Sequence, residues 1–87
     1  MHAQKQIIVI AQQRKTEALR MASGLTLLDD AVKVFVVGRL EDDAETATQL
    51  EALEFAEVPV AHVTAHDTQA MASLVDAIRG SQAVYIL

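Results

Sequence analysis

Residues 7–38 have the sequence IIVIAQQRKTEALRMASGLTLLDDAVKVFVVG, and this stretch decides the fold. It opens and closes with β-branched runs, residues 7–11 and 32–37, that are apolar at successive positions. Runs of this kind suit strands that are covered on both faces, as in parallel sheets. Between them, residues 14–28 carry apolar side chains at helical spacing: Ala18, Leu19, Met21, Ala22, Leu25 and Leu28. The stretch therefore predicts a strand, a helix and a second strand parallel to the first.

The same alternation continues along the rest of the sequence. Two more β-branched runs, residues 58–64 (VPVAHVT) and 83–87 (AVYIL), predict two further strands, and a helical pattern precedes each of them. The expected buried faces of these helices are Ala44, Ala47, Leu50 and Leu53 near residues 43–54, and then Met71, Leu74, Val75 and Ile78. Strands that alternate with helices indicate βαβ units. We predict one α/β domain over residues 1–87, a three-layer α/β/α sandwich with a mainly parallel four-stranded sheet.

Polar residues and one proline suggest where these elements begin. Thr16 or a nearby polar side chain could cap the first helix, and Asp67 or Thr68 could cap the third. Acidic residues precede the second helix, where the helix dipole favours them: Glu41, Asp42 and Asp43. Pro59 cannot donate a hydrogen bond, so we expect it at the start of the third strand or on an edge of the sheet.

Composition excludes several classes of protein. With 52% hydrophobic and 22% charged residues, the chain is unlike a disordered protein. It has no cysteine, which excludes a disulfide scaffold, a Cys-ligated zinc site and a cysteine nucleophile. A net charge of −5 argues against a nucleic-acid partner, which needs surplus Lys and Arg. Stacking platforms for bases are also scarce, because the aromatic residues are only Phe35, Phe55 and Tyr85.

No segment has the pattern of a targeting or membrane-spanning sequence. The apolar run at residues 7–11 is too short for the core of a signal peptide, and a transmembrane helix needs about 20 apolar residues. We therefore expect a soluble cytoplasmic protein without a membrane partner.

The charges are unevenly distributed along the chain. No Lys or Arg lies between Arg39 and Arg79, and acidic residues crowd the first part of that interval: Glu41, Asp42, Asp43, Glu45, Glu51, Glu54 and Glu57. Such a run is usually a solvated helix face. The alternative is an acidic docking surface for a partner.

Three predicted loops are candidates for a binding site, because open parallel sheets bind ligands outside the carboxyl ends of their strands. They are residues 11–15, 38–43 and 64–68. The first loop places two cations and free backbone N–H groups at a helix start, which suits an anion, and Arg39 lies in the second loop. The candidate ligand-binding residues are Gln12, Gln13, Arg14, Lys15, Arg39 and His66. The loop lacks the glycines of a phosphate-binding loop, so ordinary exposed helix-start residues are the alternative.

One local cluster of titratable groups has catalytic potential: His62, His66 and Asp67. Imidazole suits acid–base work near neutral pH. The two histidines fall on a strand and a loop, which do not align the rings as a metal-binding helix does, so we predict no metal site. A receiver-like domain would need clustered aspartates at strand ends, and Ala11 ends the first strand instead. We assign no catalytic residue and no cofactor.

Three helices cannot cover both faces of a four-stranded sheet equally. One face holds two helices and the other only one, so apolar surface is left uncovered in a single molecule. Contiguous exposed apolar patches usually mark partner surfaces. We therefore predict a homo-oligomer.

Two segments resemble the DsrE/DsrF-like family of small α/β domains, which includes subunits of sulfur-relay complexes. Residues 17–38 match its first helix and second strand at Ala18, Leu19, Arg20, Ala22, Val32, Val34, Phe35 and Gly38. Residues 71–87 (MASLVDAIRGSQAVYIL) are similar to its closing helix and strand. The resemblance covers more than half of the chain, mostly at packing positions.

This resemblance implies a DsrE-like fold that assembles into dimers, trimers or hexamers. In sulfur-relay members a cysteine carries a persulfide to a partner, and this chain has no cysteine and no counterpart of the cysteine-bearing segment. The resemblance therefore implies a non-catalytic oligomeric binding or scaffolding subunit, linked to sulfur metabolism or to a partner in a sulfur-relay complex. The alternative function is a small-anion or nucleotide-binding module that uses the first strand–helix loop. An enzymatic role is not favoured.

Overall fold

Strands and helices alternate along the whole chain, as the sequence predicts. The computed structural model describes residues 5–28, 30–64 and 66–87. The elements are β1 (Gln6–Ala11), α1 (Lys15–Leu25), the short 3-10 helix η1 (Thr26–Leu28), β2 (Ala31–Val37), α2 (Ala44–Phe55), β3 (Val60–Val63), α3 (Thr68–Arg79) and β4 (Ala83–Ile86). Each predicted strand and helix is present, and the differences are confined to a few residues at their ends.

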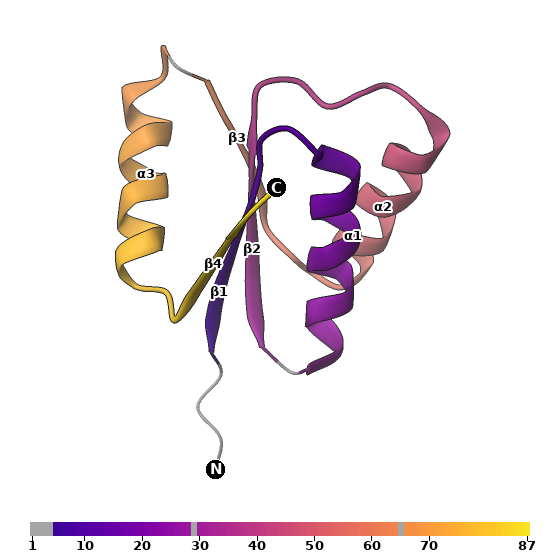
Figure 1. The fold of residues 1–87 in the computed structure, drawn as a ribbon, viewed down its shortest axis with the longest axis horizontal. Helices are drawn as coiled ribbons and strands as arrows, with labels where there is room; N and C mark the ends of the chain where they lie inside the picture. The colour runs from indigo at the N-terminus through magenta and orange to yellow at the C-terminus, as the bar shows by residue number, and fades with distance from the viewer. Residues whose placement is uncertain (1–4, 29, 65) are drawn as a thin grey trace.

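The four strands form one sheet in the order β3-β2-β1-β4, and every pair of neighbours is parallel. Val9 of the central strand β1 lies between Val34 of β2 and Tyr85 of β4. The chain steps outward from β1 to β3 and then crosses back to β4. Right-handed crossovers in opposite directions place their helices on opposite faces of a sheet. Accordingly, α1 and α2 cover one face and α3 covers the other, which gives three layers (Figure 1).

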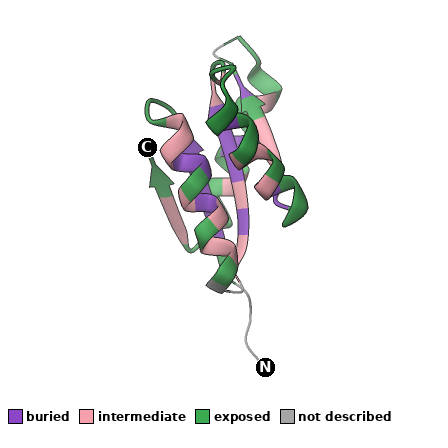
Figure 2. Cartoon of the chain, turned by 90° about the vertical axis from the view of Figure 1, so that its right-hand side faces the viewer, coloured by how far each residue is buried: buried purple, intermediate pink, exposed green. Residues whose placement is uncertain are grey.

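Two clusters of buried side chains make up the core, one on each face of the sheet. On the α1 and α2 face the fully buried residues include Val9, Leu19, Val34, Val36 and Leu53. On the α3 face the cluster is Ile8, Ile10, Phe35, Val63 and Leu74. Every residue of β1 after the first is buried, because this strand has a neighbour on both sides and helices on both faces. Figure 2 shows the buried residues gathered in the central strands and on the side of α1 that faces them.

The predicted buried face of α2 is confirmed in its second half and wrong in its first. Leu53 is fully buried and Leu50 packs against the core, whereas Ala44 and Ala47 are exposed and Thr46, at 2% exposure, is buried in their place. Thr46 can be buried because its hydroxyl lies 3.1 Å from the hydroxyl of Thr16 on α1, so the polar group keeps a hydrogen-bond partner. The contact between α1 and α2 therefore decides which side of α2 faces inward.

Aspartates cap the second and third helices. Asp43 Oδ1 accepts the backbone N–H of Thr46 at 2.7 Å, and Asp67 Oδ1 accepts that of Ala70 at 2.9 Å. The prediction of Asp67 as a cap is confirmed. These bonds satisfy N–H groups that have no partner inside their own helix.

The start of α1 differs from the prediction. Arg14 is the capping residue and its side chain makes no capping hydrogen bond, so Thr16 is not the cap. The backbone N–H groups of the preceding loop instead donate to the Leu87 oxygen, from Gln12 at 3.3 Å and from Gln13 and Arg14 at 2.8 Å each. An oxygen distant in sequence, that of Leu87, therefore accepts hydrogen bonds from the N–H groups before α1, where a capping side chain was expected.

Strand β3 is shorter than the predicted run because Pro59 lies just before it. The carbonyl of Pro59 accepts the N–H of Val34 at 2.9 Å, so the proline contributes its acceptor to the sheet although it has no donor. The strand lies at an edge of the sheet, as expected for a segment that begins at a proline.

Helix α3 buries a different row of side chains from the predicted one. Leu74 is buried, but Met71, Val75 and Ile78 are 38–43% exposed. The small side chains of Ala70 and Ala77 pack against the sheet instead. Alanine at these positions lets the helix approach the strands closely, and the larger apolar side chains point to the side.

None of the helices in the described residues is both long enough and apolar enough to span a bilayer.

Candidate functional site

The loops that follow β1 and β2 meet at the carboxyl edge of the sheet and enclose a surface cavity of about 410 Å³. The residues that line this basic cavity are Gln13, Arg14, Lys15, Thr16, Glu17, Arg39 and Glu41. Four of the six predicted ligand-binding residues are therefore brought together, from two segments more than 20 residues apart.

Gly38 brings these two segments into contact. It follows β2 with a φ of +82°, a conformation that glycine adopts without steric cost. Its N–H donates to the carbonyl of Val63 at 3.0 Å, which fixes the turn to the end of β3. A Cβ placed on Gly38 would lie 3.6 Å from Lys15 Nζ, so the Lys15 ammonium lies directly beside this turn.

The basic cavity carries more positive than negative charge. Among the described residues, Arg14, Lys15 and Arg39 form no ion pair. The carboxylate of Glu17 is paired with Arg20, 2.7 Å away, and Arg20 also contacts Glu45 of α2. Three cations thus face one remaining carboxylate, that of Glu41, on a chain whose net charge is −5.

The first turn of α1 adds hydrogen-bond donors to this charge. The first bond inside the helix runs from the N–H of Ala18 to the carbonyl of Arg14 at 3.0 Å. The three N–H groups before Ala18, those of Lys15, Thr16 and Glu17, therefore have no carbonyl partner within the helix. The positive end of the helix dipole lies at the same place. This arrangement can bind an anion by charge and by hydrogen bonds together.

Two predicted site residues lie elsewhere. Gln12 lines a separate apolar cavity on the α3 face, together with Ile10 and Met71. His66 is exposed in the loop before α3 and does not line the basic cavity. Gln12 and Gln13 follow one another in the loop after β1 but line different cavities.

Asp43 lies next to the basic cavity in sequence, at the start of α2. Hydrogen bonds from the side chain and the backbone of Thr46 lower the pKa of its carboxyl below the ordinary value of 3.8. The carboxylate therefore stays ionised and committed to capping the helix.

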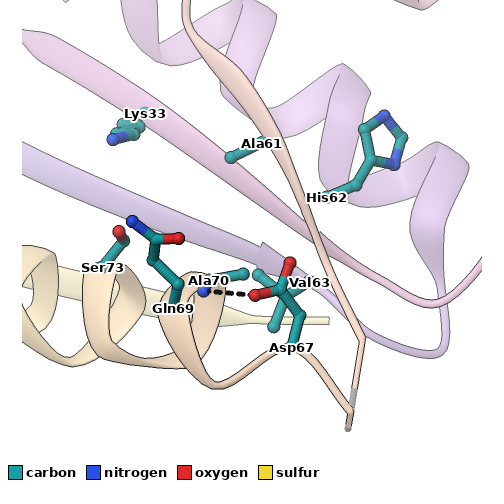
Figure 3. A pocket seen from close by; sticks show the side chains of 8 residues that line it. All are labelled: Lys33, Ala61, His62, Val63, Asp67, Gln69, Ala70 and Ser73. Carbon is teal, nitrogen blue, oxygen red and sulfur yellow. Dashed lines mark hydrogen bonds between the residues drawn. The ribbon is translucent and has the colours of Figure 1, made fainter.

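The predicted acid–base cluster does not assemble. A second cavity, of about 350 Å³, contains both His62 and Asp67 in its lining (Figure 3). The ring of His62 points away from the cavity across β3, whereas Asp67 turns toward α3 and caps it. Because neighbouring residues of a strand face opposite sides, His62 lies on the other face from Ala61 and Val63.

The cation in the lining of this second cavity, Lys33, lies over an aromatic ring. Lys33 Nζ lies 4.9 Å from the centre of the Phe35 ring, a distance typical of a cation–π contact. Among the residues that the structure describes, no three His, Asp or Glu side chains are arranged to hold a metal ion. His62 and Asp67 therefore do not converge on a common point in this cavity.

Thr16 and Glu41, which line the basic cavity, and Gly38, which lies beside Lys15 next to it, were not among the predicted site residues. Gly38 could have been recognised, because a glycine directly after a buried strand often marks a turn with positive φ. The positions of Thr16 and Glu41 depend on how the two loops meet, which no local pattern encodes.

Comparisons with known proteins support the fold. No family model and no curated protein matches the chain. A crystal structure of the yeast protein YNL200c matches with a TM-score of 0.58 and 28% sequence identity over 67% of this chain. The matched two thirds of this chain correspond to 25% of the yeast chain. These results assign no family, and the DsrE/DsrF-like resemblance stays a prediction.

Proposed function

We propose that this chain is a binding domain that takes a small anion, such as a phosphate group or the phosphate of a nucleotide, in the basic cavity. The observation that carries the proposal is the convergence of Arg14, Lys15 and Arg39 on one cavity without an ion pair among the described residues. Like-charged side chains repel one another, and an anion bound between them would relieve that repulsion.

The expected ligand follows from the donors present. Two guanidinium groups offer paired N–H donors that suit phosphate or carboxylate oxygens, and the Lys15 ammonium adds a point charge. The first-turn N–H groups of α1 point toward the same end of the helix. A cavity of about 410 Å³ has room for a phosphate group and part of the molecule that carries it.

The proposal is tested by measuring the thermal unfolding of the protein with inorganic phosphate and with nucleoside phosphates. A ligand present at about 100 times its dissociation constant should stabilise the folded state by about 2.7 kcal/mol. We expect the Arg39→Ala variant to lose most of this stabilisation, because it removes one of the three cations.

The matched control is Arg79→Ala, which removes the same charge at the far end of α3. It should bind the ligand as the unchanged protein does, and added NaCl should weaken binding in both. A flat response to every phosphate, or an equal loss in the Arg39 and Arg79 variants, would contradict the proposal.

A second role is favoured by the exposed apolar side chains of α3 and β4, which are described below. We propose that the domain is also a non-catalytic subunit of a larger assembly, as the DsrE/DsrF-like resemblance implies. The absence of cysteine is consistent with a subunit that does not carry a persulfide itself. Retention of purified sulfur-relay proteins on the immobilised chain would support the link to sulfur relay, and failure to retain any of them would contradict that link.

A further inference from the structure

Within the described residues, α3 is the one helix on its face of the sheet. Packed helices lie 8–10 Å apart and parallel strands about 4.8 Å apart, so one helix covers roughly two strands. The opposite face has two helices for the same four strands (Figure 1). A strip about one helix wide is therefore left uncovered on the α3 face.

The uncovered strip lies over β4. Ile86 is opposite Ile10 in the register, so both side chains lie on the α3 face, and yet Ile10 is 7% exposed and Ile86 is 63% exposed. The strand contains no buried residue at all, and Figure 2 shows it at the margin of the sheet in the colours of intermediate and exposed residues. In the part of the chain that the structure describes, β4 pairs with β1 alone, and no strand pairs with its other edge.

The two flanks of α3 differ in polarity. Toward β3 the helix presents Gln69 and Ser73, which line the second cavity with Lys33 (Figure 3). Toward β4 it presents Met71, which lines an apolar cavity of about 320 Å³ with Ile86. Val75 and Ile78 continue this flank, four and seven residues after Met71. Together with two residues of β4 they form the α3–β4 surface: Met71, Val75, Ile78, Val84 and Ile86.

We propose that the α3–β4 surface is the interface of a symmetric homodimer, in which α3 of each copy lies antiparallel to α3 of the other and covers the partner's β4. The uncovered strip has the width of one helix, and the helix that fills it must carry an apolar row on one side. Helix α3 has such a row, still exposed. A surface of this kind is self-complementary, as a two-fold axis requires.

The charges favour a second copy at this surface over the rest of the molecule. The chain has a net charge of −5, and acidic residues crowd α2 and its flanks, so two copies repel one another there. From residue 67 onward the charged residues are only Asp67, Asp76 and Arg79. Antiparallel packing also places Arg79, at the end of one α3, near the start of the other α3. That start carries the capping carboxylate of Asp67, so opposite charges meet there.

This inference rests on the assembly role proposed above, but its test concerns self-association alone. Sedimentation equilibrium over a range of micromolar concentrations should show a species of twice the 9.4 kDa chain mass. Val75→Glu places a charge at the centre of the α3–β4 surface and should raise the dissociation constant about tenfold or more. Ser73→Glu adds the same charge to the polar flank of the same helix and should leave it unchanged.

If Val75→Glu impairs folding, the homodimer can be tested by a covalent cross-link instead. Because the chain has no cysteine, Val75→Cys introduces a single thiol. Mild oxidation should link two Val75→Cys chains across the two-fold axis, whereas Ser73→Cys chains should stay unlinked. A monomer at all concentrations overturns the inference, as does a dimer that survives Val75→Glu or a link that forms equally through position 73.

The outcomes separate this inference from the other proposals. A monomer that retains a sulfur-relay protein through this surface would overturn the homodimer and leave the assembly role standing. Phosphate binding is read independently from the Arg39 variant, because Arg39 lies on the loop after β2 and not on α3.

Discussion

At the scale of single residues, short hydrogen bonds decide where the helices begin. Asp67 could be recognised in the sequence because a capping aspartate and the N–H it accepts are three residues apart. Thr16 was the wrong choice for α1, since the N–H groups of that loop find their acceptor at Leu87, which is adjacent in space only. Local capping is encoded in local sequence, whereas an acceptor supplied by another strand is not.

Asp43 provides a prediction with a defined pH dependence. Because the folded-state pKa lies below the ordinary value, the ionised carboxylate stabilises the folded protein above that value. The stabilisation is lost as the pH falls through the folded-state pKa. Asp43→Asn keeps a capping oxygen but cannot ionise, so it should lower the unfolding midpoint at neutral pH, and the gap to the unchanged protein should narrow in acid.

Urea unfolding at neutral and acidic pH measures this gap. Asp42→Asn is the matched control, because it removes a neighbouring charge that caps no helix, and its gap should be smaller. A gap for Asp43→Asn that widens as the pH falls would have the wrong sign.

At the scale of elements, periodicity identified each helix but only part of the buried side of α2 and α3: Leu53 and Leu74 are buried as predicted, and other predicted residues are exposed. Apolar side chains at helical spacing show that a helix has an inward side, but the partner decides which row is buried. On α2, Thr46 is buried in the contact with α1 because its hydroxyl has a hydrogen-bond partner there, the hydroxyl of Thr16. On α3 the sheet selects the alanine row, because small side chains allow close approach, and leaves Val75 and its neighbours exposed.

Two apolar residues of α2 test which side of the helix faces the core. Leu53 is fully buried and Phe55 is 92% exposed, although they are two residues apart. Leu53→Ala should destabilise the protein by about 2–5 kcal/mol, because it removes contacts and leaves a cavity. Phe55→Ala should change the free energy of unfolding by less than about 0.5 kcal/mol. Chemical denaturation of both variants measures the difference, and similar losses would show that α2 is rotated otherwise.

At the scale of the whole molecule, the fold class and the location of the candidate site could be predicted, but the strand order could not. Ligands of parallel sheets bind at the carboxyl ends of the strands, and this rule predicted from the sequence that the loops of Arg14 and Arg39 belong to the candidate site. Which strand neighbours which is decided by the crossover of α3, and hydrophobic periodicity contains no information on it. The face with the single helix was predicted from counting elements, and Ile86 is its clearest sign.

The uneven charge distribution predicts a response to salt. Acidic residues crowd α2 and its flanks, and among the described residues only Glu45 of that group is paired, with Arg20. Raising the ionic strength from about 0.01 M to about 0.15 M shortens the screening length from about 30 Å to about 8 Å. The thermal unfolding midpoint should therefore rise with added NaCl.

A double variant isolates the cause of this rise. Glu51→Gln and Glu54→Gln together remove two of the crowded carboxylates, so the midpoint should be higher at low salt and depend less on NaCl. If salt lowers the midpoint of the unchanged protein, attraction rather than repulsion dominates its surface.

The position of β1 at the centre of the sheet has a consequence for biosynthesis. Its last neighbour is β4, and the hydrogen bond from the N–H of Gln82 to the carbonyl of Gln6 joins groups 76 residues apart. A nascent chain on the ribosome therefore holds its most apolar strand with one open edge until β4, residues 83–86, has been translated. During that interval the growing polypeptide is a natural client for chaperones, and slow translation of its second half would prolong that dependence.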